Sequence, residues 1–309
     1  MTNHPRPWIL WLGVGFMTLC WSVNFIVGKI TLRHLDVVTL MPFRIILAGL
    51  ILLCIYLANP RRARLSRHDI WTFAMLGFFG VALNQGFFTL GLNYTTAGHS
   101  SLIIAVSPIL VLLFAMGLGL EGHTAWRMIG MLISFTGVAV LATEQGLHLH
   151  SGNLLGDLIT IGGDIGFAIY AVLGKRVAAR YDSLSMNTFN TLAASILFLP
   201  LAIHQGARLN WEAVGWIGWG GMFYMAAFSS VVGYLIFYWA LRYMAASRLS
   251  AFSYVQPVVV NILGIALLGE RVTTRLLIGG AMILVGVYVT ERRFGKNDED
   301  SANGSSAVQ

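Results

Sequence analysis

The sequence has few charged residues for its length. Of its 309 residues, 11% are Asp, Glu, Lys or Arg and 57% are hydrophobic, whereas soluble globular domains carry about 25% charged residues. This shortage excludes an ordinary soluble domain and predicts a protein of the lipid bilayer. The net charge is +7. Because the basic residues lie in short clusters between apolar runs, the excess does not indicate a nucleic-acid partner.

Cysteine and the motifs of enzyme chemistry are also scarce. The two cysteines, Cys20 and Cys54, lie inside apolar runs, which argues against a disulfide framework. The sequence has no Gly-x-x-x-x-Gly-Lys-Ser/Thr phosphate loop and no His-Glu-x-x-His motif. We therefore expect no direct use of ATP, no cofactor and no metal. His148 and His150 alternate in a loop, but they lack the Cys or carboxylate companions typical of a metal site.

Long apolar runs separated by short polar segments make up nearly the whole chain. Residues 98–120 and 249–269 contain no charged residue and reach the roughly 20 residues that an α-helix needs to cross the hydrocarbon core. The pattern predicts an all-α integral membrane protein with ten transmembrane helices, and a disordered cytoplasmic tail at residues 295–309. The predicted spans are residues 8–30, 37–57, 71–92, 97–119, 125–143, 154–175, 184–203, 213–240, 246–269 and 274–291.

The chain also contains an internal duplication. Residues 246–287 repeat residues 97–138 at an offset of 149, so that Pro108 falls on Pro257, and at an offset of 146 Lys29 falls on Lys175. We therefore predict two domains of five spans each, at residues 8–143 and 154–291.

The distribution of charge predicts how the two repeats lie in the membrane. Most Lys and Arg residues fall on the side that holds both termini, which predicts cytoplasmic N- and C-termini in the inner membrane. An odd number of spans in each repeat then gives the halves opposite orientations. Inverted repeats of this kind occur in many secondary transporters, whose substrate site lies near the midplane between the halves.

Several short motifs resemble one family. They are Trp21-Ser22-Val23-Asn24-Phe25 followed by Lys29, Arg44 with Ala48, the segments 108–121 and 257–270, Gly156-Asp157-Leu158, and Phe167-Ala168-Ile169-Tyr170. Together they resemble the EamA-type family of the drug/metabolite transporter superfamily. The resemblance implies a ten-span, inverted-repeat carrier with a central cavity, most often an exporter of amino acids, other metabolites or drugs. Its partners would be a small-molecule substrate and the lipid bilayer, with proton exchange and a homodimer left open. One departure is Asp164, where the family more often has a small apolar residue.

Polar and aromatic side chains inside the predicted spans are candidates for binding substrate, because a polar group is costly in hydrocarbon. Trp21 and Asn24 share one helix face. Gln85 falls on Tyr234 at the offset of 149, and Tyr238 shares a face with Tyr234. These positions predict a site near the axis that relates the halves. In the alternative interpretation, Asn24 joins two helices by a hydrogen bond and the others make ordinary helix contacts.

Two ionisable residues inside spans are the sharpest candidates. Arg44 lies about 10 Å inside its helix, where it is predicted either to grip a carboxylate with its planar fork or to extend towards the membrane surface. Asp164 lies near the centre of its span and is predicted to be paired with a cation or protonated. If it faces the cavity, it binds a cationic group or carries a proton. If it faces another helix, it is a structural hydrogen-bonding group beside three neighbouring glycines.

Pro108 and Pro257 fall inside predicted helices, where proline removes a backbone hydrogen bond and kinks the helix. A matched pair of kinks predicts either a moving element or a lining of the cavity. Ser253 and Gln256 precede Pro257 closely enough to satisfy the carbonyl that it frees.

Three classes of function are compatible with these features. A secondary carrier accounts for the inverted repeat, the matched prolines and the polar midplane positions. A non-transporting scaffold or receptor would not need them, and an intramembrane enzyme would need a catalytic motif that the sequence lacks. We therefore predict a transporter, and no enzyme, that exports small amphipathic metabolites or drugs by alternating access.

Overall fold

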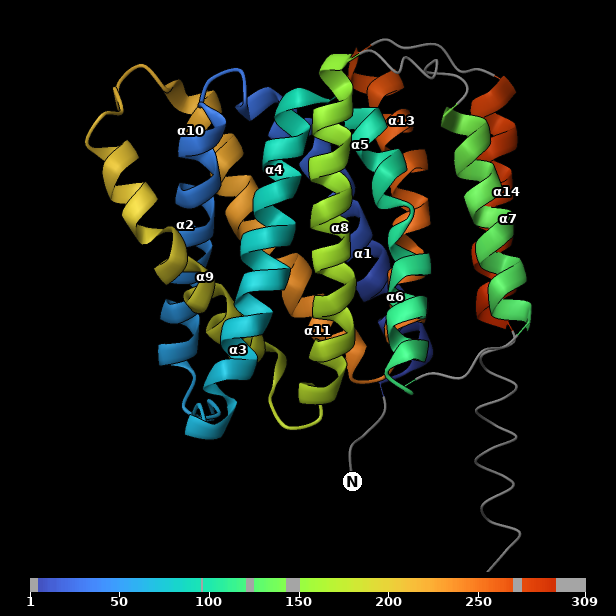
Figure 1. The fold of residues 1–309 in the computed structure, drawn as a ribbon, viewed down its shortest axis with the longest axis horizontal. Helices are drawn as coiled ribbons and strands as arrows, with labels where there is room; N and C mark the ends of the chain where they lie inside the picture. Colours follow the sequence, from blue (N-terminus) through green and yellow to red (C-terminus); the bar gives the residue numbers. More distant parts are fainter. Residues whose placement is uncertain (1–4, 96, 121–124, 143–150, 269–273, 293–309) are drawn as a thin grey trace, which may run out of the picture.

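The computed structural model describes residues 5–95, 97–120, 125–142, 151–268 and 274–292. Within these ranges the chain forms helices and the turns between them (Figure 1). The prediction of an all-α protein is confirmed for this part of the chain. The first half contains α1 (Pro7–Thr31), α2 (Val37–Ala58), η1 (Arg67–Asp69), α3 (Ile70–Leu76), η2 (Gly77–Leu83), α4 (Asn84–Tyr94), α5 (Ala97–Ile104), α6 (Ser107–Gly117) and α7 (Ala125–Ala142). The second half contains α8 (Ser151–Val177), α9 (Ser183–Gly206), α10 (Gly215–Tyr224), η3 (Met225–Gly233), α11 (Tyr234–Leu241), α12 (Ala246–Ser250), η4 (Ala251–Tyr254), α13 (Val255–Leu268) and α14 (Thr274–Arg292).

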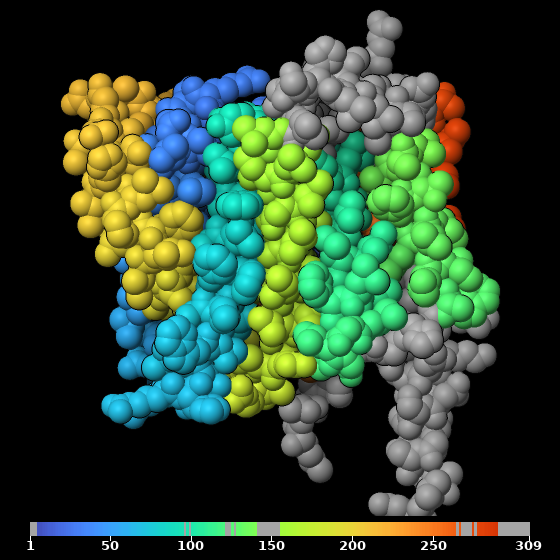
Figure 2. Space-filling view, in the orientation of Figure 1, coloured from blue at the N-terminus to red at the C-terminus, as the bar shows by residue number. Residues whose placement is uncertain are grey.

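Seven helical stretches in the described ranges are long and apolar enough to cross a membrane, and two shorter apolar helices occur at Met128–Val140 and Leu277–Val289. Large apolar side chains remain exposed along the sides of the bundle, such as Ile161 on α8 and Ile196 on α9. Figure 2 shows the side of the bundle that α9, in yellow, and α8, in yellow-green, form. Exposure of so many large apolar side chains is unfavourable in water and suits contact with lipid. The seven stretches are Pro7–Thr31, Val37–Ala58, Arg67–Tyr94, Ser100–Gly117, Leu155–Val177, Ser183–Gly206 and Gly215–Leu241.

The third helical stretches of the two halves run in opposite directions. In Figure 1, α3 lies near the lower end of the bundle and α4 near the upper end, whereas α10 lies near the upper end and α11 near the lower end. The N-terminus is at the lower end.

A lysine ties the first helix of each half to the end of the third stretch. The Lys29 ammonium donates to the carbonyl oxygens of Leu92, at 2.8 Å, and Thr95, at 2.7 Å. Lys175 donates at 2.6 Å to each of two carbonyls at and just beyond the end of α11, which correspond to these at the offset of 149. Both ammonium groups lie where the helix dipole favours positive charge. Each half is therefore fastened internally in the same way.

Each third stretch contains a π-helical segment, η2 in the first half and η3 in the second, at corresponding positions. Such segments occur frequently at functional sites because they free backbone groups and shift side chains. Asn187 on α9 donates to the carbonyl oxygens of Ser230, at 3.1 Å, and Val231, at 3.2 Å, within η3. In η2, a Cβ atom at Gly80 would overlap the ring of Tyr170, so glycine is required for α8 to approach.

The last helices of the halves, α7 and α14, pack against each other along small residues and stand together at the right of Figure 1. A Cβ atom at Gly137 would lie 2.6 Å from the carbonyl oxygen of Gly279. Ser134 donates to the carbonyl oxygen of Ile283 at 3.2 Å. Positions 134 and 283 correspond at the offset of 149, and corresponding residues can touch only near the axis that relates the halves. That axis therefore passes between α7 and α14.

The fourth stretch of each half is interrupted at its proline. α5 ends before α6 begins, with Pro108 in the first turn of α6. In the second half, η4 separates α12 from α13, and Pro257 is the third residue of α13. The interruption divides each helix in two, which is a larger break than the predicted kink. Proline causes it because its ring clashes with the carbonyl four residues earlier and it donates no hydrogen bond.

Candidate substrate site

A cavity that is partly open to its surroundings lies between the two halves. Among the residues predicted to bind substrate, those that line it are Trp21, Asn24, Arg44, Gln85, Asp164 and Tyr234. The other lining residues are Phe25, Asn84, Phe88, Ile104, Ser107, Phe167, Ser229, Ser253 and Gln256. The cavity is thus lined by both repeats, and the segments beside both prolines contribute to it.

Arg44 on α2 is fully buried, with 1% of its surface exposed. Its Nη1 donates to Thr89 Oγ1 at 3.0 Å, and its Nη2 donates to Gln85 Oε1 at 3.0 Å and to Ser230 Oγ at 3.3 Å. Nε is buried without a hydrogen-bond partner. None of these partners carries a negative charge. The guanidinium is therefore held in place by neutral groups, an arrangement that favours an incoming anion.

The hydrogen bonds around Arg44 join the two halves. Ser230, in η3, also donates to Gln85 Oε1 at 2.6 Å. Arg44, Gln85 and Ser230 thus form a closed triangle across the boundary between the repeats. A solute bound by Arg44 would therefore contact a hydrogen-bond network that both halves share.

Asp164 on α8 is 3% exposed. Ser107 Oγ donates to its Oδ1, and its Oδ2 is buried with no hydrogen-bond partner. The neighbouring glycines lie elsewhere on α8: a Cβ atom at Gly163 would lie 3.2 Å from the carbonyl oxygen of Asn84, and one at Gly166 would lie 2.8 Å from the carbonyl oxygen of Phe79. The glycines therefore serve the packing of α8 on α4 and η2, while Asp164 lies on the cavity.

Aromatic rings form one wall of the cavity. The ring of Trp21 lies 5.3 Å from that of Tyr234 and 6.1 Å from that of Phe167. Trp21 Nε1 donates to the carbonyl oxygen of Ser229 at 3.2 Å, and the Tyr234 hydroxyl donates to Asn84 Oδ1 at 2.9 Å. Positions 21 and 167 correspond at the offset of 146. Because they touch, the axis that relates the halves passes along this wall.

Asn24 lies beside this wall on α1 and is 4% exposed. Its Oδ1 is buried and accepts no hydrogen bond. An interhelical hydrogen bond of the kind that the alternative interpretation describes therefore does not use this oxygen. An acceptor that lines the cavity is therefore available to a donor group of a solute.

Tyr238 differs from the other predicted contacts, because it does not line the cavity. It is fully buried, and its hydroxyl accepts from Asn190 Nδ2 at 2.6 Å. The Tyr238 ring packs 5.5 Å from that of Tyr170, behind the aromatic wall. The Asn190–Tyr238 bond corresponds to the Arg44–Thr89 bond at the offsets of 146 and 149. Both halves therefore form a hydrogen bond at the same place. The donor is a charged guanidinium in the first half and a neutral amide in the second.

Ser107, Thr89 and Ser230 are the polar partners that sequence reasoning missed. Each is a small hydroxyl residue in an apolar run, where serine and threonine usually bond to their own helix. The spacing of Thr89, four residues after Gln85, was an available signal. No sequence signal indicated Ser107 or Ser230.

A cavity enclosed between two similar halves of a helical membrane bundle is characteristic of transport proteins. The chain belongs to the EamA-like transporter family, whose model matches residues 7–143 and again residues 154–292. The predicted family is thereby confirmed, and the chain is a multi-pass membrane protein of a transporter family.

Relatives cover nearly the whole chain. An uncharacterized transporter of Archaeoglobus fulgidus is 28% identical over 92% of this chain and 99% of its own length. The uncharacterized transporter YyaM of Bacillus subtilis is 25% identical over 92% of this chain and 93% of its own. One solved crystal structure of a protein superposes with a TM-score of 0.72 at 19% identity, covering 93% of this chain and 97% of that one, and so shares the fold.

Proposed function

We propose that the protein is a secondary transporter that exports small amphipathic metabolites, such as amino acids or drugs that resemble them, across the cytoplasmic membrane. The observation that carries the proposal is a cavity, lined by both halves, that holds a guanidinium whose hydrogen-bond partners are all neutral and a carboxylate oxygen that has no hydrogen-bond partner. Arg44 would bind an acidic group of the solute and Asp164 a cationic group. The aromatic wall beside Trp21 would take the apolar part.

The proposed architecture is ten transmembrane helices in two inverted repeats, at residues 8–143 and 154–291. The opposite directions of the third stretches support it (Figure 1), as do the contacts between corresponding residues of the halves. The three spans beyond the seven are α7, the stretch α12–η4–α13, and α14. The tail at residues 295–309 lies outside the described residues.

Alternating access is the proposed mechanism. The fourth stretches are interrupted and the third stretches contain π-helical segments, at corresponding positions in the two halves. At these positions the regular α-helix is broken. Breaks of this kind give rigid helix segments a place to bend. Because both pairs adjoin the cavity, bending there would open it towards either side in turn.

Export is tested by comparing metabolites in cells and medium with and without overproduction of the protein. We expect at least one small solute with acidic and basic groups to accumulate in the medium, and we expect Asn24→Ala to reduce this accumulation because it removes an acceptor from the cavity. Gly15→Ala is the matched control on the same helix, since nothing lies within 4 Å of the added Cβ atom. Identical profiles for producing and non-producing cells, with the protein present in the membrane, would contradict the export proposal.

Topology is tested with single cysteines and a membrane-impermeant thiol reagent. We expect His148→Cys to react from outside intact cells and Arg64→Cys to react only after permeabilisation, because positive charge is retained on the cytoplasmic side. Residue 148 lies outside the described residues, in the segment 146–152 that we place outside the cell. The reverse pattern would refute the proposed orientation.

A further inference from the structure

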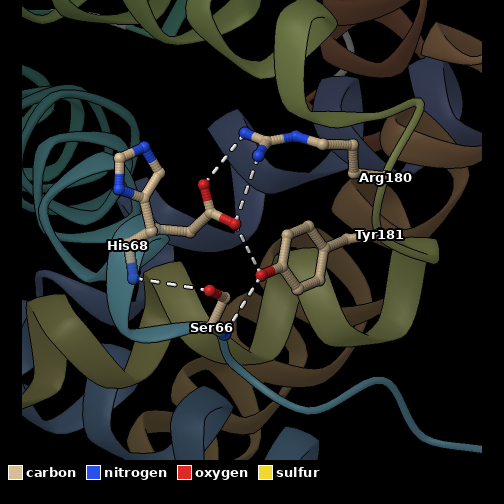
Figure 3. Close-up of polar contacts among 5 residues, drawn as sticks. Ser66, His68, Arg180 and Tyr181 are labelled. Carbon is tan, nitrogen blue, oxygen red and sulfur yellow. Dashed lines mark hydrogen bonds and ion pairs between the residues drawn. The ribbon is translucent and has the colours of Figure 1, made fainter.

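A polar contact joins the two halves at the end of the bundle that holds the N-terminus (Figures 1 and 3). Arg180 Nη2 lies 2.9 Å from Asp69 Oδ1, and Arg180 Nη1 donates to Asp69 Oδ2 at 3.4 Å. The Tyr181 hydroxyl donates to the same Oδ2 at 2.8 Å, and it accepts from the backbone N–H of Ser66 at 3.2 Å. Asp69 and Ser66 precede α3 in the first half, whereas Arg180 and Tyr181 connect α8 to α9 in the second.

The two charged groups of this contact are buried to different degrees. The Asp69 side chain is 6% exposed and that of Arg180 is 54% exposed. A buried carboxylate depends on its partners far more than an exposed guanidinium does. Tyr181 packs edge-on against Phe73, with the ring centroids 5.0 Å apart. Burial raises the pKa of the Tyr181 phenol above its ordinary value, so the hydroxyl remains a donor throughout the physiological pH range.

The corresponding contact at the opposite end lacks the carboxylate and the phenol, and a histidine stands in place of the arginine. Positions 69, 180 and 181 correspond to Gly218, His34 and Leu35 at the offsets of 149 and 146. These residues also meet, since a Cβ atom at Gly218 would lie 3.2 Å from His34 Cβ and 3.7 Å from Leu35 Cγ. Glycine replaces the carboxylate there and leucine replaces the phenol. Corresponding positions at the two ends therefore carry side chains of different chemistry.

The lysine contacts inside the two halves do not differ in this way. Lys29 and Lys175 fasten the interior of each half identically. An opening of either end would separate the third stretch of one half from the loop of the other. At the N-terminal end that motion must break a bidentate, charge-assisted contact of a buried carboxylate. At the opposite end the corresponding residues, Gly218, His34 and Leu35, have no carboxylate or phenol with which to form such a contact.

We propose that Asp69, Arg180 and Tyr181 form a latch that keeps the N-terminal end of the cavity closed, so that the resting protein favours opening at the other end. This inference rests on the proposed function, because a latch requires a cavity whose two ends open in turn. The latch has no role in binding the solute, since none of its three residues lines the cavity.

The test measures access to the cavity and needs no substrate. Ile104→Cys, in a chain with Cys20→Ala and Cys54→Ala, places a single thiol at a cavity-lining position. An impermeant thiol reagent is then applied to vesicles of each orientation. We expect Asp69→Asn to raise the rate of labelling from the N-terminal side about tenfold, the scale of one charge-assisted hydrogen bond, and to lower the rate from the opposite side. Unchanged rates from both sides would refute the latch.

A second set of variants separates the latch from general loosening of the fold. Arg180→Gln alone, and combined with Asp69→Asn, should give the same increase as Asp69→Asn, because the two residues act through one contact. Additive effects would contradict a shared latch.

Asp36→Asn removes a carboxylate that caps α2, and asparagine caps a helix equally well, so this control should leave labelling unchanged. If Asp69→Asn does not reach the membrane, Tyr181→Phe, which removes only the hydroxyl, should raise labelling in the same direction, and no rise would refute the latch.

The outcomes of this test and of the export test are independent. A protein that exports no detectable solute but shows the expected labelling retains the latch and loses the proposed substrate. A protein that exports a solute but shows no change in labelling retains the function and loses the latch.

Discussion

Arg44→Gln is expected to reduce export of a solute that bears a carboxylate by about 10- to 100-fold, the scale of a lost charge-assisted hydrogen-bonding contact. The protein should still be made, because the partners of the guanidinium are Thr89, Gln85 and Ser230, all neutral. Removing Arg44 therefore leaves no charged hydrogen-bond partner unpaired. The measurement is the initial rate of efflux from preloaded cells at a solute concentration below KM.

Two further arginine variants define what Arg44 does. Arg44→Lys keeps the charge but loses the planar fork, so efflux should be intermediate between those of the wild type and Arg44→Gln. Arg33→Gln removes the same charge from an exposed position beyond α1 and should export at the full rate. If Arg44→Gln exports at the wild-type rate with normal amounts of protein, the guanidinium is structural and the proposed anion contact is wrong.

Asp164→Asn is expected to reduce export about tenfold or more and to remove its dependence on pH. Asparagine keeps the shape of the side chain and can still accept a hydrogen bond from Ser107, but it cannot titrate or hold a cation by charge. Both proposed roles, binding a cationic group and carrying a proton, are lost together. The measurement is the efflux rate across a series of external pH values in the wild type and the variant.

The control for Asp164→Asn is Asp36→Asn, which removes an exposed carboxylate outside the cavity and should leave both the rate and its pH response intact. Ser107→Ala tests the positioning of the carboxylate. Because it removes the donor to Oδ1 without removing the charge, it should lower the rate and keep the pH response. An Asp164→Asn protein with the rate and pH dependence of the wild type would rule out both roles of the carboxylate.

The sequence predicted the features that depend on composition and on the repeat. Charge-free runs located the helices because a span needs about 20 apolar residues. The offset paired Gln85 with Tyr234, and the two lie on one cavity because the halves are related by an axis. Arg44 and Asp164 stood out because ionisable groups inside spans are rare.

Features that depend on tertiary packing were not predictable. The π-helical segments follow from neighbours such as Asn187, which binds carbonyls in η3 from another helix. Tyr238 shares a face with Tyr234 but lies one turn, about 5–6 Å, farther along the helix, which places it behind the wall instead of on the cavity. The periodicity of a helix specifies the face of a side chain but not the depth at which a cavity ends.

The contact between Trp21 and Phe167 across the axis has a consequence for the ancestry of the chain. In an inverted pair of identical five-helix proteins, this contact would join two copies of the same residue, and a second arginine would occupy the place of Asn190. Every mutation in such a pair appears in both copies. The two sides of the cavity, and its two ends, must therefore stay chemically identical. Joining the copies in one chain removes that constraint. The chain can then carry one arginine, one buried carboxylate and one latch. A solute with an acidic end and a basic end can then bind in only one orientation.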